Sequence, residues 1–193
     1  MDPELKQYLD SLTPDQLPWN RMFSAYGNAD NFGELLKEMA ETADFDQWNR
    51  CFRGLSDMEH QSTLCPPAPF VTAFLLRILE RELQRTERSA IAETMLGVFP
   101  YYLDICHEAE RTYHAAPLPH LWDLLDERYL LPEGVSEEEL EEFFEDPDSV
   151  PETLWYSFYY YSKAVLAEVP ELLDRYGKYP EISAVLKQKL TDT

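Results

Sequence analysis

Apolar residues recur along this chain at the spacing of helices. The clearest series follows a proline-rich segment and consists of Val71, Phe74, Leu75, Ile78, Leu79 and Leu83. These positions fall at i, i+3, i+4, i+7, i+8 and i+12, which place them on one face of a helix. No stretch alternates apolar and polar residues over the length of a strand. The pattern therefore predicts an all-α protein.

Capping residues and prolines predict where the helices of the first half begin and end. Pro18 is a residue type that opens a helix and Gly27 one that closes it, so a helix is expected between them. Asp30 is the expected N-cap of the next helix, and Asp44 or Asp46 that of a third. The segment from His60 to Pro69 cannot be helical, because three prolines remove backbone donors and restrict the residues before them.

The second half also predicts helices. The expected segments are Ser89 to His114, Pro119 to Tyr129, a helix opened by a capping box of Ser136 and Glu139, Thr153 to Tyr176, and Glu181 to Leu190. Pro100 either kinks the first of these or opens a second helix. Pro170 interrupts the Thr153 to Tyr176 stretch, and Gly177 is placed to close it.

Length and composition predict one globular domain spanning residues 1–193. The chain is long enough to bury one substantial core, and its apolar content is that of a folded protein. Three cysteines at irregular spacing are expected to be free, buried thiols of a reducing compartment. The first residues lack a signal-peptide pattern, and the longest apolar run, Val71 to Leu76, is too short for a membrane span. A cytoplasmic location is expected, with no membrane partner.

The net charge is −21, from 37 acidic and 16 basic residues. A field of this sign repels nucleic-acid phosphate and anionic lipid and attracts basic proteins. The charge therefore argues against direct nucleic-acid binding and favours a partner with a basic surface. Solubility alone is a second explanation of the charge, and it remains open.

Several motifs in the first half of the chain resemble those of a known family. Trp19 is followed by Ala25-Tyr26-Gly27, Ala29-Asp30 and Leu35-Leu36, and then by His60-Gln61, a proline-containing loop and Phe74-Leu75-Leu76. This order is similar to that of bacterial HEAT-like helical-repeat proteins. The resemblance implies a HEAT-like α-α superhelix, a short solenoid of antiparallel helical hairpins, over residues 15–115. A more divergent, acidic and aromatic-rich helical part occupies residues 116–193.

Some members of this family are similar to immunity proteins that neutralise toxins. The chain departs from the family pattern at two sites. Ser62 stands where the family has Gly after His-Gln, and Cys65-Pro66-Pro67 stands where it has an Ala-Thr stretch. These departures leave the shape of this loop open.

Few residues could support catalysis. Cys106, His107, Glu110, His114 and His120 lie near one another in sequence, but the run starting at His107 lacks the second histidine of a His-Glu-x-x-His zinc motif. His60 could act as a base or, alternatively, cap a helix end or bond to backbone groups left unpaired by the prolines. No phosphate-binding loop or nucleophile motif occurs. The sequence predicts a protein that is not an enzyme and carries no cofactor or metal.

An acidic run followed by an aromatic run is the best candidate for a binding surface. No lysine or arginine occurs from Tyr129 to Ser162, and six of the seven residues from Trp155 to Tyr161 are aromatic. Six rings at helical spacing cannot all face one core, so some are expected at an interface. The predicted partner-binding residues are Glu137, Glu138, Glu141, Glu142, Glu145, Asp146, Asp148, Trp155, Tyr156, Tyr159 and Tyr160. The alternative is an inner helix sandwiched between two layers.

These observations predict a non-catalytic protein-binding protein, in its most specific form an immunity-type inhibitor of a basic protein toxin. An acidic nucleic-acid mimic that blocks a nucleic-acid-binding protein is an alternative function. A metal-dependent hydrolase centred on Cys106, His107 and His114 is a third.

Overall fold

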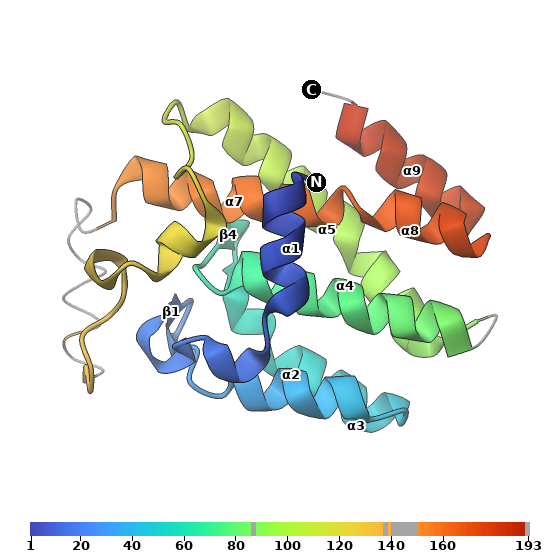
Figure 1. Ribbon diagram of the computed structural model, residues 1–193, viewed down its shortest axis with the longest axis horizontal. Helices are drawn as coiled ribbons and strands as arrows, with labels where there is room; N and C mark the ends of the chain where they lie inside the picture. The colour runs from blue at the N-terminus through green and yellow to red at the C-terminus, as the bar shows by residue number, and fades with distance from the viewer. Residues whose placement is uncertain (86–87, 137–138, 140–149, 192–193) are drawn as a thin grey trace.

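The computed structural model describes residues 1–85, 88–136, 139 and 150–191. The described chain is mostly helical, which confirms the predicted all-α class (Figure 1). The helices are α1 (Pro3–Ser11), α2 (Phe32–Glu41), α3 (Phe45–Gly54), α4 (Ala68–Arg85), α5 (Ala90–Thr112), α7 (Glu152–Leu166), α8 (Val169–Tyr176) and α9 (Pro180–Thr191). Short 3₁₀ turns are η1 (Pro14–Gln16), η2 (Trp19–Arg21), η3 (Ser56–Met58), η4 (Leu121–Leu125) and η5 (Glu127–Tyr129).

Helix α7 lies at the centre of the molecule, where it packs most extensively against α4 and α5. The α2–α3 pair lies on one side of this group and the α8–α9 pair on another, while α1 crosses in front (Figure 1). One hydrophobic core runs through these layers and includes Trp48, Phe70, Phe99 and Phe158, all at most 1% exposed. None of the helices in the described ranges combines the length and apolarity that a membrane span needs.

Two small antiparallel hairpins each precede a helix. The first pairs β1 (Phe23–Ser24) with β2 (Gly27–Asn28), and the second pairs β3 (Glu59–His60) with β4 (Thr63–Leu64). Every paired residue of the first hairpin has its equivalent 36 positions later in the second. In both, the residue after the hairpin donates its amide hydrogen to the carbonyl of the residue before it, at 3.0 Å in the first and 2.9 Å in the second. The chain thus repeats one local design, a 3₁₀ turn, a hairpin and a helix.

The predicted helix from Pro18 to Gly27 is wrong. The structure has η2 there, followed by the first hairpin. Gly27 has a φ of 146°, so its conformational freedom serves the hairpin and not a helix cap. Proline and glycine occur at helix ends and at tight turns alike, so these residues by themselves do not distinguish a helix from a hairpin.

The helix predicted from Pro119 to Tyr129 is also wrong in type, because η4 and η5 occupy this segment. Pro100 lies within the continuous helix α5, so it does not open a second helix. Ser136 and Glu139 form the predicted reciprocal bonds, with Ser136 N–H to Glu139 Oε2 at 2.8 Å and Glu139 N–H to Ser136 Oγ at 3.3 Å. The helix expected after them lies outside the described residues.

Asp30 is not the N-cap of the next helix, because Asn31 occupies that position ahead of α2. Several other predicted boundaries are confirmed. Asp44 caps α3 by accepting the Gln47 amide hydrogen at 2.7 Å. Gly177 ends α8 with a φ of 63°. The proline-rich segment is non-helical only as far as Pro67. Ala68 and Pro69, predicted to be non-helical, form the first turn of α4, where proline is tolerated. Cys51, Cys65 and Cys106 are free and buried, as predicted.

Candidate functional site

The predicted partner-binding residues fall into two groups. Seven acidic ones lie outside the described residues, namely Glu137, Glu138, Glu141, Glu142, Glu145, Asp146 and Asp148. The four aromatic ones, Trp155, Tyr156, Tyr159 and Tyr160, lie on α7 and can be placed.

Helix α7 divides its aromatic side chains between the core and the surface. Tyr159 is 3% exposed and its hydroxyl accepts the Leu64 amide hydrogen at 3.2 Å, so this ring is part of the core. Trp155 is half-buried with its ring 5.7 Å from that of Phe23, and Tyr156 is half-buried near Tyr113. Tyr160 is 43% exposed. Tyr160 is therefore the most exposed member of this set.

The segment 117–119 is bound along α7 by two buried hydrogen bonds. Leu118 donates its amide hydrogen to Ser157 Oγ at 2.8 Å, and its carbonyl accepts the Tyr161 hydroxyl at 2.6 Å. Ser157 and Tyr161 are four residues apart and therefore lie on one face of the helix. Pro117 and Pro119 flank Leu118 and favour the extended backbone that this pairing requires.

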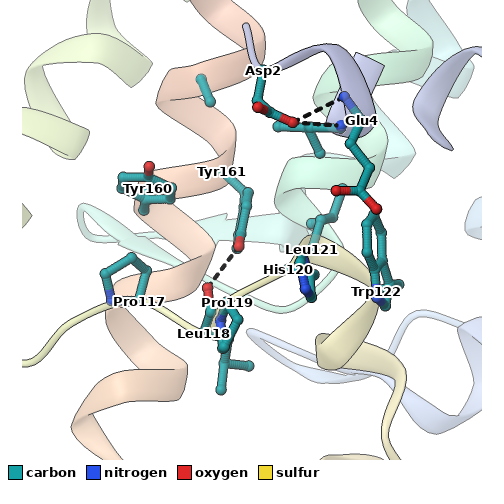
Figure 2. Close-up of a pocket in the computed structure, with 12 residues that line it drawn as sticks. Asp2, Glu4, Pro117, Leu118, Pro119, His120, Leu121, Trp122, Tyr160 and Tyr161 are labelled. Atoms are coloured by element: carbon teal, nitrogen blue, oxygen red, sulfur yellow. Dashed lines mark hydrogen bonds between the residues drawn. The ribbon is translucent and has the colours of Figure 1, made fainter. Parts of the chain in front are cut away.

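A pocket of about 380 Å³ lies between this segment, α7 and the start of α1 (Figure 2). Its walls combine the rings of His120, Trp122, Tyr160 and Tyr161 with apolar side chains such as Leu5 and Leu121. Asp2 and Glu4 add two carboxylates at the α1 side of the pocket. No lysine or arginine is among the lining residues of this pocket.

Ring stacking holds the aromatic wall of this pocket in place. Trp122 is half-buried and stacks on His120, with centroids 4.4 Å apart and planes inclined by 11°. Tyr8 contacts the Trp122 ring edge-on, with centroids 5.1 Å apart. The Tyr160 and Tyr161 rings meet at 87°, 5.1 Å apart. Contacts of this kind are worth roughly 0.5–1.5 kcal/mol each, which limits ring motion.

Of the pocket residues, only Tyr160 was predicted as a site residue from the sequence. Asp2, Glu4 and Trp122 were missed because they lie at least 30 residues from α7 along the chain. One sequence signal was present: two prolines enclosing one apolar residue, next to His120 and Trp122, predict an extended segment beside aromatic rings.

The residues proposed for a metal centre do not come together as one site. Cys106 is buried, and burial raises the pKa of its thiol to about 12. Burial, reinforced by the charge of Lys163, lowers the pKa of His107. Glu110 accepts two hydrogen bonds of 2.7 Å from the Lys163 ammonium group. His120 takes no part in this ion pair and lines the pocket described above.

Within the described ranges, no three His, Cys, Asp or Glu side chains are close enough to hold a metal ion. His60 lies in strand β3 of the second hairpin. Its ring lies 2.8 Å from the Tyr26 hydroxyl at the hairpin end of the molecule.

Comparisons with known proteins identify no relative of this chain, since no family model, curated protein or solved structure matches it.

Proposed function

We propose that this protein binds a basic partner protein and catalyses no reaction. The observation that carries the proposal is the pocket beside α7, which combines two carboxylates with aromatic rings and has no basic lining residue. Aromatic side chains are the preferred anchors of protein interfaces, and a net charge of −21 accelerates the approach of a basic partner. In its most specific form, the protein is a cytoplasmic, immunity-type inhibitor that occludes the active site of a basic toxin.

The proposal includes a HEAT-like superhelix as the scaffold of this surface. Recurrence of the hairpin-and-helix design at 36 residues supports a repeat architecture. In such an architecture, each helix pair buries its apolar face against its neighbours and leaves one edge for binding.

A capture experiment tests the function. The immobilised protein is incubated with lysate of its source cell at low and high salt, and retained proteins are identified by mass spectrometry. We expect a basic protein that is released by salt, because screening weakens charge attraction between exposed groups. Retention of acidic proteins only, or of none, would contradict the proposal.

Charge-reversal variants then locate the surface with the purified partner. The triple variant Glu138→Lys/Glu141→Lys/Glu142→Lys is expected to weaken binding of the partner at least tenfold. Tyr160→Ala is expected to have an effect of the same size. The matched control is the triple variant Glu34→Lys/Glu41→Lys/Glu171→Lys, since all three residues are exposed and belong neither to the pocket lining nor to the acidic stretch of residues 137–148. Equal losses of affinity in the test variant and in the control variant would mean that the charge of this protein acts only at long range.

The alternative function is mimicry of a nucleic acid, and the acidic stretch without lysine or arginine from Tyr129 to Ser162 favours it. In that case the captured partner binds DNA or RNA, and nucleic acid competes with this protein for one site. Competition is expected to depend steeply on salt. A partner that binds both simultaneously would exclude mimicry.

A further inference from the structure

The α1–α7 pocket has the chemistry of a receptor for an organic cation. Two carboxylates, four aromatic or imidazole rings and several apolar side chains line a volume of about 380 Å³. A cation placed over an aromatic face is attracted by its negative quadrupole, and a carboxylate nearby adds charge pairing. An anion would find no basic side chain among the lining residues.

Both carboxylates have capacity for a ligand. Asp2 uses Oδ1 to accept the amide hydrogens of Glu4 and Leu5, at 2.9 and 3.2 Å, which caps α1 (Figure 2). These bonds hold the Asp2 side chain in place and leave Oδ2 without a partner among the described residues. The Glu4 carboxylate is exposed and likewise makes no hydrogen bond or ion pair within the described part of the chain.

The rings that face this space are already ordered. Trp122 is held between His120 and Tyr8. Tyr161 is fixed by its 2.6 Å bond to the Leu118 carbonyl, and it supports Tyr160 edge-on. A ligand that enters therefore pays little conformational entropy for ordering the wall, which strengthens binding.

We propose, building on the function proposed above, that this pocket receives one arginine side chain of the basic partner. A guanidinium group is planar, so it stacks on Tyr160 or Trp122 while its N–H groups pair with a carboxylate. Its aliphatic stem packs against apolar walls that include Leu5, Pro119 and Ala164. Lysine is a compact, strongly hydrated charge and uses neither the stacking nor the paired donors.

The test is an NMR titration with N-acetyl-L-arginine amide, which represents an arginine within a protein chain. The Trp122 indole N–H signal is assigned by its absence in Trp122→Phe. We expect a saturable shift of this signal with Kd of about 1–10 mM, as for a single small anchor. N-acetyl-L-citrulline amide, which has nearly the same shape without the charge, is expected to bind at least tenfold more weakly. The lysine analogue is expected to bind several-fold more weakly than the arginine analogue. No saturable shift, or equal binding of the citrulline analogue, overturns the proposal.

Two variants test the assigned roles. Glu4→Gln and Tyr160→Leu are each expected to weaken arginine amide binding about fivefold or more, through loss of charge and loss of the ring. Glu181→Gln on α9 makes the same change of charge outside the pocket and is expected to leave Kd unchanged. Unchanged Kd in both pocket variants overturns the proposal.

Agmatine distinguishes a free small molecule from a protein side chain as the source of the guanidinium. Binding of the blocked arginine at least as tight as that of agmatine supports a protein source, whereas agmatine binding more than tenfold tighter overturns it.

Failure of this inference can be told apart from failure of the proposed function. Salt-sensitive capture of a basic partner without arginine binding in the pocket removes only this inference. Arginine binding without any captured basic protein removes the proposed function.

Discussion

Two consecutive residues at the tip of the second hairpin hold a backbone conformation that side chains disfavour. Gln61 has a φ of 49° and Ser62 a φ of 67°, and positive φ at both central residues is the signature of a type I′ turn. Glu59 stabilises the turn, because its Oε1 accepts the Ser62 amide hydrogen at 2.8 Å and the Tyr101 hydroxyl at 3.0 Å. The neighbouring contacts therefore offset a local cost of roughly 1–2 kcal/mol for each residue.

Changing this turn to Asn-Gly is expected to stabilise the protein. The double variant Gln61→Asn/Ser62→Gly has the pair preferred in type I′ turns, and the free energy of unfolding should rise by about 1 kcal/mol. Urea denaturation measures the change. Ser56→Gly is the control, because Ser56 has no positive φ and glycine relieves nothing there. A variant no more stable than the natural protein would contradict the strain assigned to these residues.

At the scale of elements, hydrogen bonds between side chains and backbone attach an irregular segment to a helix. Leu118 has both backbone groups satisfied by α7, through Ser157 and Tyr161. Periodicity could not predict this attachment, because the partners are about 40 residues apart in sequence. The same limit explains the wrong helices at Pro18–Gly27 and Pro119–Tyr129, where local signals are shared by helix ends, turns and 3₁₀ segments.

The attachment predicts a contrast between two adjacent tyrosines. Tyr161→Phe leaves the buried Leu118 carbonyl without its donor and should lower the free energy of unfolding by about 1–3 kcal/mol. Tyr160→Phe removes a hydroxyl of a partly exposed ring that has no hydrogen bond among the described residues, and should change it by less than about 0.5 kcal/mol. Equal effects in denaturant unfolding would argue against the buried bond.

At the scale of the whole molecule, charge dominates. Exposed ion pairs such as Lys6–Asp10 contribute little, typically about 0–1 kcal/mol, so they do not cancel the repulsion of a net charge of −21. Screening this repulsion should favour the folded state. The same screening should weaken binding to the proposed basic partner, so stability and this affinity are expected to change in opposite directions with salt.

Thermal unfolding tests this expectation. Raising NaCl from about 0.01 M to about 0.15 M shortens the screening length from about 30 Å to about 8 Å. We expect Tm to rise by about 2–4 °C, which corresponds to roughly 1 kcal/mol for a chain of this size. Near pH 4.4, the isoelectric point, the net charge is close to zero, so the rise in Tm caused by salt should be smaller. An increase of equal size at both pH values would show that salt acts by another route.

The sequence by itself determined the helical class, several helix ends and the burial of the cysteines, because periodicity, caps and apolar character are properties of neighbouring residues. It also determined the acidic field, which is a sum over the chain. Only the tertiary structure decided that Tyr159 enters the core while Tyr160 faces solvent, since the answer depends on where α4 and α5 cover α7. The pocket itself likewise exists only once α1, the 117–122 segment and α7 are brought together by folding.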